Sequence, residues 1–120
     1  MSDTLQNATV LVTGGAGLIG SHIVDCLVDA GAREIRVLDN LVRGRIDNLA
    51  EATARHPIKF IPGDIRDRAV VADAVRGCDY VFHEAAIRIT LCAELPRECI
   101  DVLITGALNV FEAAAEARVK

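Results

Sequence analysis

Long apolar runs are missing from this sequence, and with them the simplest sign of a membrane protein. No stretch approaches the roughly 20 apolar residues that span a bilayer. The N-terminus, Met1-Ser2-Asp3-Thr4, has no basic segment leading into an apolar one, as a secretory leader would. We therefore expect a cytoplasmic protein without a membrane partner.

Charge of one sign is also missing. The 13 Lys and Arg residues and the 17 Asp and Glu residues are mixed along the whole chain, and the net charge is −4. Binding to a phosphate backbone would require a basic stripe. We therefore expect no nucleic-acid partner.

Metal-ligand spacing is absent as well. Zinc sites bring cysteines and histidines together in close pairs, whereas these residues are scattered here. The cysteines are Cys26, Cys78, Cys92 and Cys99, and the histidines are His22, His56 and His83. We expect four free thiols and no bound metal.

The sequence does contain short apolar strands that alternate with amphipathic stretches, within a length and composition typical of one globular domain. The patterns predict strands at 8–12, 34–38, 59–61 and 80–82, and helices at 18–30, around 46–54, at 66–76 and from Pro96 onward. Alternating strands and helices indicate right-handed crossovers between parallel strands. The predicted fold class is α/β, a partial Rossmann-type doubly wound parallel sheet of about four strands with flanking helices, over residues 1–120.

Three glycines lie between the first predicted strand and the first predicted helix: Gly14, Gly17 and Gly20. Glycines allow a tight turn and a close approach of the backbone to a pyrophosphate, and Gly20 would let the helix pack closely on the sheet. The free N–H groups and the dipole of the helix start would then bind the anion. Their spacing of three and three differs from the two and three of the usual dehydrogenase fingerprint, and simple turn punctuation is the alternative.

Asp39 ends the second predicted strand, 19 residues after Gly20. A carboxylate in this place accepts hydrogen bonds from the ribose hydroxyls of an adenosine and repels a 2′-phosphate, which favours NAD over NADP. An ordinary Asp39-Asn40 turn is the alternative. Arg43 and Arg45 follow, and an arginine there can accommodate a phosphate, so NADP stays open.

Four segments together resemble one family: T-G-G-A-G-L-I-G at 13–20, L-D-N at 38–40, G-D-I-R-D at 63–67 and V-F-H-E-A-A at 81–86. The chain resembles the extended short-chain dehydrogenase/reductase family, and within it the NAD-dependent nucleotide-sugar epimerases and dehydratases. The similarity continues to the helix at 105–114. It implies an NAD cofactor and, in the full-length protein, a nucleotide-sugar substrate that passes through a keto intermediate, with epimerase the first choice.

The resemblance also implies a set of cofactor-binding residues. The glycine turn and the amides of Leu18 and Ile19 would contact the pyrophosphate, residues 39–44 the adenosine ribose, residues 64–65 the adenine, and residues 85–87 the nicotinamide side. Arg88 would reach cofactor or substrate phosphates. The full set is Gly14, Gly17, Leu18, Ile19, Gly20, Asp39, Asn40, Arg43, Gly44, Asp64, Ile65, Ala85, Ala86, Ile87 and Arg88.

Several of these positions have a second interpretation. Asp64 could cap a helix that begins near Ile65, and Ala85-Ala86 could be small only for packing. We interpret His83 as a packed residue at a strand end. Glu84 stands where relatives often have an apolar residue, and the sequence offers no reason for it.

Two features of the resembled family are missing. Leu103-Ile104-Thr105-Gly106-Ala107 replaces the Asn-Val-x-Gly-Thr of many relatives, which puts their asparagine contact in doubt. The catalytic Ser or Thr and the Tyr-x-x-x-Lys pair are also absent: the sole tyrosine, Tyr80, is followed four residues later by Glu84. We therefore assign no catalytic residue and interpret residues 1–120 as an NAD-binding portion without the catalytic and substrate-binding part.

Two other hypotheses remain. The chain could be a non-catalytic dinucleotide-binding sensor or regulatory module, because folds retain cofactor sites without chemistry. It could also be an assembly fragment whose exposed fourth strand seeks a partner edge, which would make a homodimer.

Overall fold

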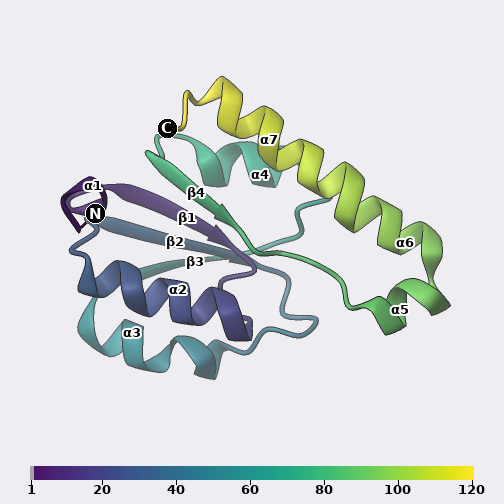
Figure 1. Cartoon of the computed structure of the whole chain (residues 1–120), viewed down its shortest axis with the longest axis horizontal. Helices are drawn as coiled ribbons and strands as arrows, with labels where there is room; N and C mark the ends of the chain where they lie inside the picture. The colour runs from purple at the N-terminus through teal and green to yellow at the C-terminus, as the bar shows by residue number, and fades with distance from the viewer. Residues whose placement is uncertain (1) are drawn as a thin grey trace.

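The computed structural model describes residues 2–120, and their side chains from residue 4 onward. Its centre is a four-stranded parallel sheet in the order β3-β2-β1-β4 (Figure 1). The strands are β1 (Thr9–Thr13), β2 (Glu34–Asp39), β3 (Ile58–Pro62) and β4 (Tyr80–His83). All carboxyl ends lie at one edge, where Thr13 pairs with Leu38 on one side and His83 on the other. The predicted Rossmann-type fold is confirmed.

Helices cover both faces of the sheet (Figure 1). α2 (Leu18–Asp29) and α3 (Ala50–Arg55), with a 3-10 turn at Ile46–Leu49, lie on one face; α4 (Arg68–Val75) and α7 (Ala107–Glu116) lie on the other. A short α1 (Ser2–Leu5) precedes β1. Within residues 2–120, no helix combines the length and apolarity needed to cross a membrane.

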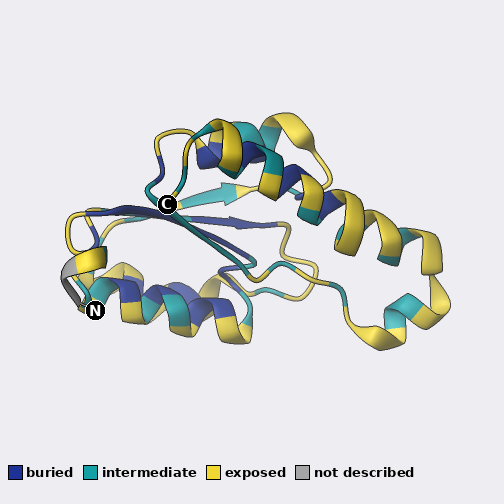
Figure 2. Ribbon diagram, turned by 45° about the horizontal axis from the view of Figure 1, so that its top comes forward, coloured by how far each residue is buried: buried dark blue, intermediate teal, exposed yellow. Residues whose placement is uncertain are grey.

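β1 is the most buried element, as its unbroken apolar sequence predicts. All five of its residues are buried, and it lies between two apolar clusters, one on each face of the sheet. Val24 and Leu27 of α2 pack on one face, and Val71 and Val110 pack on the other. In Figure 2, burial is concentrated on the central strands and on the inner sides of the helices. This core sets the position of the carboxyl edge of the sheet.

The helix ends follow local chemistry. α2 ends at Asp29, and Gly31 has the left-handed φ of +77° that the sequence predicts for its stop. The helix predicted at 66–76 begins at Arg68 instead, because the Asp67 side chain accepts hydrogen bonds from the N–H groups of Ala69 and Val70. The interpretation of Asp64 as the cap of this helix is therefore wrong.

The end of the chain has more structure than the sequence predicts. α6 (Pro96–Ile100) begins at Pro96 as expected, but a separate α5 (Ile89–Glu94) precedes it. A π-helical segment, Asp101–Gly106, joins α6 to α7 in one long helix, and α5 and α6 project beyond the sheet (Figure 1).

The prediction of four free thiols is also wrong. Cys92 of α5 and Cys99 of α6 are joined by a disulfide, with 4.9 Å between their Cα atoms. The turn at Leu95-Pro96 folds α5 back on α6, so residues seven apart in sequence become neighbours. Cys26 and Cys78 are free, the first exposed and the second buried.

Candidate functional site

A cleft of about 560 Å³ lies at the carboxyl ends of the strands. All members of the full set of cofactor-binding residues given above line it, from Gly14 of the glycine turn to Arg88 before α5. Val42, within the predicted range 39–44, lines it as well. Residues that the sequence analysis missed also line it: Leu38, Asn48, Gly63, Arg66, Leu91, Glu98 and Val102. Glu84, whose polar side chain was unexplained, is also part of the wall.

The glycine turn places backbone where a side chain would not fit. Gly14 has a φ of +67°, and its N–H donates to the carbonyl of Leu38 at 2.8 Å. A Cβ on Gly14 would lie 2.8 Å from the backbone of Ala85. The turn is therefore pressed directly against the segment that follows β4.

The N-terminus of α2 opens into the same cleft. The first intrahelical bond runs from the Ser21 N–H to the Gly17 carbonyl at 3.0 Å, so the N–H groups of Leu18, Ile19 and Gly20 have no partner within the helix. The cap residue, Gly17, adds no side chain, and the first turn carries no acidic residue. These features make the helix start suited to an anion.

Gly20 has a different role from the one predicted. A Cβ at this position would overlap the carbonyl oxygen of Gly14 and approach the Cα of Gly15 to 2.8 Å. The missing side chain thus lets α2 pack on the glycine turn itself rather than on the face of the sheet.

Asp39 holds the turn from the side of β2. This buried carboxylate accepts a hydrogen bond from the Ala16 N–H at 3.0 Å and another from the Leu41 N–H at 2.8 Å. The Ala16 carbonyl in turn accepts from the side chain of Asn48 at 2.8 Å. A carboxylate has about four acceptor positions, so each oxygen of Asp39 retains capacity for a ligand hydroxyl.

Asp64 is held by an arginine that the sequence analysis did not single out. The Arg66 guanidinium donates to both carboxylate oxygens of Asp64, at 2.7 and 3.0 Å, and holds the pKa of Asp64 at about 2. The Asn40 amide donates to the same carboxylate at 3.3 Å. Arg66 also lies 3.8 Å from a carboxylate oxygen of Glu98 on α6, so it links the loop after β3 to the projecting helices.

A buried hydroxyl fixes the segment after β4. Thr13 Oγ1 accepts from the N–H groups of Glu84 and Ala85 at 3.1 and 3.2 Å, and it lies 2.7 Å from His83 Nδ1. The two backbone N–H groups can only donate, so the Thr13 hydroxyl accepts from them and donates its own proton to His83 Nδ1. The imidazole proton of His83 is therefore on Nε2. Burial lowers the pKa of His83, which favours this neutral form. His83 is thus packed at the strand end, but it is also part of a hydrogen-bond network.

The long helix contacts the site through Asn109 of α7 and through Gly106, the last residue of the π-helical segment. Asn109 is buried and donates to the carbonyls of Ile65 and Arg66 at 2.9 and 3.3 Å. A Cβ on Gly106 would lie 2.6 Å from the side chain of Ile65, so the helix approaches closely there. Leu103 is exposed, whereas Asn109, one turn and a half further along, is buried and makes these contacts.

The charges of the cleft leave two arginines available. Arg66 is paired, whereas Arg43 and Arg88 are exposed and form no ion pair within the part of the chain that the structure describes. In the same residues, no cluster of three or more histidine, cysteine or acidic side chains has the geometry to hold a metal ion. The site therefore offers helix amides and two arginines to an anion, and the Asp39 carboxylate to hydroxyl groups.

The comparison with known proteins agrees with this geometry. The model of the 3-beta hydroxysteroid dehydrogenase/isomerase family matches residues 11–120. The chain belongs to this family.

The relatives of this chain include enzymes that act on nucleotide sugars. The UDP-glucose 4-epimerase of Rickettsia canadensis is 32% identical over 116 residues, which are 92% of the chain and 34% of the epimerase. The structure of the epimerase Mth375 from Methanothermobacter thermautotrophicus superposes with a TM-score of 0.90 at 35% identity, over 98% of the chain and 34% of that protein. These matches confirm the resemblance to nucleotide-sugar epimerases and dehydratases.

A third relative was solved with ligands. The dTDP-glucose 4,6-dehydratase DesIV of Streptomyces venezuelae, in a structure with NAD and TYD bound, is 36% identical with a TM-score of 0.84, over 92% of the chain and 37% of that protein. The chain thus spans about a third of the length of the relatives that it matches.

Proposed function

We propose that this chain is the NAD-binding portion of a nucleotide-sugar epimerase or dehydratase. The observation that carries the proposal is the Asp39 carboxylate, buried at the end of β2 and hydrogen-bonded to the glycine turn. It places a hydroxyl acceptor and a helix N-terminus side by side in one cleft. NAD presents to such a cleft a ribose diol and a pyrophosphate at the corresponding positions.

The fit of NAD follows from the order of the strands. A dinucleotide lies across the carboxyl ends of the strands at the point where the strand order reverses, which here is between β1 and β4. The pyrophosphate would lie on the amides of Leu18–Gly20. The adenosine half would extend over Asp39–Gly44, and its adenine would meet Asp64 and Ile65. The nicotinamide half would lie along Ala85–Arg88.

NAD, when bound, supplies a hydride acceptor for a sugar carbon and returns the hydride to the resulting keto sugar. The residues of this chain would bind and orient the cofactor. The glycine turn lets the backbone approach, and Thr13 holds the Glu84–Ala85 backbone in place at the nicotinamide side. Proton transfer would require groups beyond those identified in this chain. Epimerase remains our first choice over dehydratase, on resemblance alone.

Arg43 and Arg88 lie at opposite ends of this path. Arg43 follows Asp39 on the adenosine side, where it would be the group to accept a 2′-phosphate of NADP. Asp39 opposes that phosphate by charge, so we propose NAD as the preferred cofactor. Arg88, on the nicotinamide side, is exposed and suited to a diphosphate of a nucleotide-sugar substrate.

A non-catalytic dinucleotide-binding module, as a sensor or regulatory unit, is the alternative function. A dinucleotide-binding sensor would use the same cleft without turning over a sugar. Expression of the gene in full and assay with UDP- and dTDP-sugars separates the two, because only the enzyme converts one sugar to another. A homodimer is a further proposal, which sedimentation at several concentrations tests.

Calorimetric titration with NAD and NADP tests the cofactor site. We expect NAD to bind more tightly than NADP, and Asp39→Ala to weaken NAD binding by about tenfold or more, since it removes a charge-assisted hydrogen bond. Asp47→Ala is the matched control, because Asp47 is exposed on the neighbouring 3-10 turn and does not line the cleft. If NAD does not bind, or if both variants bind it like the unaltered chain, the proposal is wrong.

A further inference from the structure

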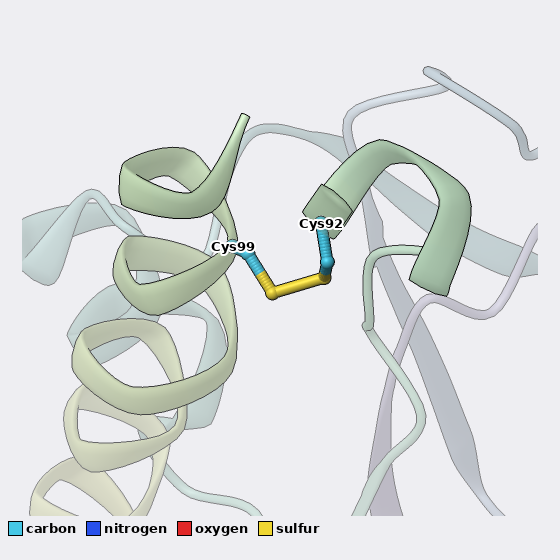
Figure 3. The surroundings of a disulfide bond; sticks show 2 residues. All are labelled: Cys92 and Cys99. Carbon is cyan, nitrogen blue, oxygen red and sulfur yellow. A yellow bond between two sulfur atoms is a disulfide. The ribbon is translucent and has the colours of Figure 1, made fainter. Parts of the chain in front are cut away.

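The Cys92–Cys99 disulfide lies in the part of the molecule that projects beyond the sheet. It joins the end of α5 to α6 across the turn at Leu95-Pro96, and both cysteines are half-buried (Figure 3). Neither β-strands nor the apolar clusters of the core include this segment. The disulfide is therefore a local constraint rather than a brace of the whole fold.

This constraint acts on a wall of the cleft. Leu91 precedes Cys92 and Glu98 precedes Cys99, and both neighbours line the cleft. Glu98 also approaches Arg66, which holds Asp64. Any change in how α5 sits on α6 therefore reaches residues that face the proposed cofactor.

α5 has little else to hold it. It is six residues long, none of them buried, and its first turn has no side-chain cap. A helix this short is not stable by itself in water. Exposed segments with few buried apolar contacts are the ones that open locally. The disulfide is thus a covalent tie between α5 and α6, in a segment without buried side chains of its own.

We infer that the Cys92–Cys99 disulfide is a redox-sensitive latch on the cleft, closed when oxidised and opened by a dithiol reductant. In the opening step, one thiolate of the reductant attacks a sulfur of the pair and the Cys92–Cys99 bond breaks. The second thiol of the reductant then attacks the reductant sulfur of the mixed disulfide and displaces the remaining protein cysteine as a thiolate. The reductant leaves as a disulfide, and Cys92 and Cys99 take up two electrons and two protons as free thiols. Cys92 and Cys99 are both partly exposed, which makes this attack possible.

The reduced state loosens the nicotinamide side of the cleft. α5 follows directly on Ala85–Arg88, so its release frees the distal end of that segment, whereas Thr13 still holds the end nearest β4. The effect on NAD rests on the function proposed above. Asp39 and the glycine turn stay in place, because they are tied to β1, β2 and α2.

Two measurements on the chain test the latch: NAD affinity by calorimetry, and amide hydrogen exchange of residues 86–95, each with the protein oxidised and after reduction by dithiothreitol. Reduction is expected to weaken NAD binding about fivefold or more, and to speed exchange across α5 while β1 and β2 stay protected. The double variant Cys92→Ser/Cys99→Ser should behave like the reduced protein under all conditions. Cys26→Ser, which removes an exposed free thiol on α2, should respond to reduction like the unaltered chain.

The outcomes separate the latch from the cofactor site. If exchange and NAD affinity are the same in both redox states, or if thiol counting finds no disulfide after oxidation, the latch is wrong although NAD binds. If neither state binds NAD, the proposed function fails and the effect on cofactor with it. The exchange of residues 86–95 then still decides whether the disulfide controls α5.

Discussion

Gly14 and Gly77 form a matched pair for measuring how much stability a side chain at the cleft would cost. Both have positive φ, +67° and +78°, so an alanine at either position costs about 1 to 2 kcal/mol in a left-handed conformation. They differ in their surroundings. A Cβ on Gly14 would meet the backbone of Ala85 at 2.8 Å, whereas a Cβ on Gly77 would meet nothing within 4 Å.

We therefore predict that Gly14→Ala lowers the free energy of unfolding by about 2 kcal/mol more than Gly77→Ala, because the clash with backbone adds to the shared strain. Urea unfolding of both variants measures the difference. Gly14→Ala should also abolish NAD binding, and Gly77→Ala should leave it intact. Equal losses of stability would mean that the turn is not pressed against the segment after β4.

Asp64 gives the molecule a pH dependence with a defined sign. The hydrogen bonds from Arg66 lower its folded-state pKa to about 2, below the value near 3.9 of an unfolded chain. The ionised form is thus favoured by folding, so the stabilisation is present above about pH 4 and is lost as the pH falls toward 2.

The matching experiment compares the unaltered chain with Asp64→Asn by urea unfolding between pH 6 and pH 2. We expect the unaltered chain to be the more stable above pH 4 and the difference to shrink toward pH 2. Arg66→Gln should raise the pKa of Asp64 in an NMR titration of its carboxyl carbon. A difference in stability that does not change with pH would contradict the Asp64–Arg66 pair.

At the scale of elements, α4 depends on a cap that lies outside it. Asp67 accepts from two N–H groups of the first turn of α4, whereas Asp73, within the helix, forms an exposed pair with Arg76. We predict that Asp67→Ala costs about 1 kcal/mol of unfolding free energy, and that Asp73→Ala costs less than about 0.5 kcal/mol. Thermal unfolding of both variants measures this, and similar effects would show that Asp67 is not the cap.

The same element shows what the sequence can and cannot predict. The strands and the helix of α2 were predictable, because an unbroken apolar run marks a doubly buried strand and Gly31 marks a helix stop. The start of α4 was not predictable, because aspartate is a residue type that caps helices and both Asp64 and Asp67 stand near the start. Only the folded backbone shows that Asp67 is the cap. α5 was not predictable either. None of its residues is buried, so its sequence has no apolar face at helical spacing that would indicate a helix.

The site divides in the same way. Glycines and Asp39 were predictable because their spacing from strand ends reflects backbone geometry. Arg66 and Asn48 were not, because their partners, Asp64 and Ala16, are reached only through folding of separate loops. The disulfide was missed because cysteine spacing does not show that Pro96 begins a helix folded back on its neighbour.

At the scale of the whole molecule, the two ends of the sheet are different surfaces. The carboxyl edge carries the cleft with its glycine turn, Asp39 and the exposed Arg43 and Arg88. At the amino edge, a shallow hollow is lined by residues such as Arg33, His56 and Lys59. A sheet of parallel strands puts all carboxyl ends together, so it concentrates helix N-termini and loop side chains at one edge.

The most direct measurement of the central claim is the shift of backbone amide NMR signals when NAD is added to the chain. The account predicts shifts at Leu18–Gly20, at Asp39–Gly44 and at Ala85–Arg88, with the largest at the start of α2, and little change near Arg33 and Lys59. Shifts confined to the amino edge, or none at millimolar NAD, would contradict the claim that this cleft binds the dinucleotide.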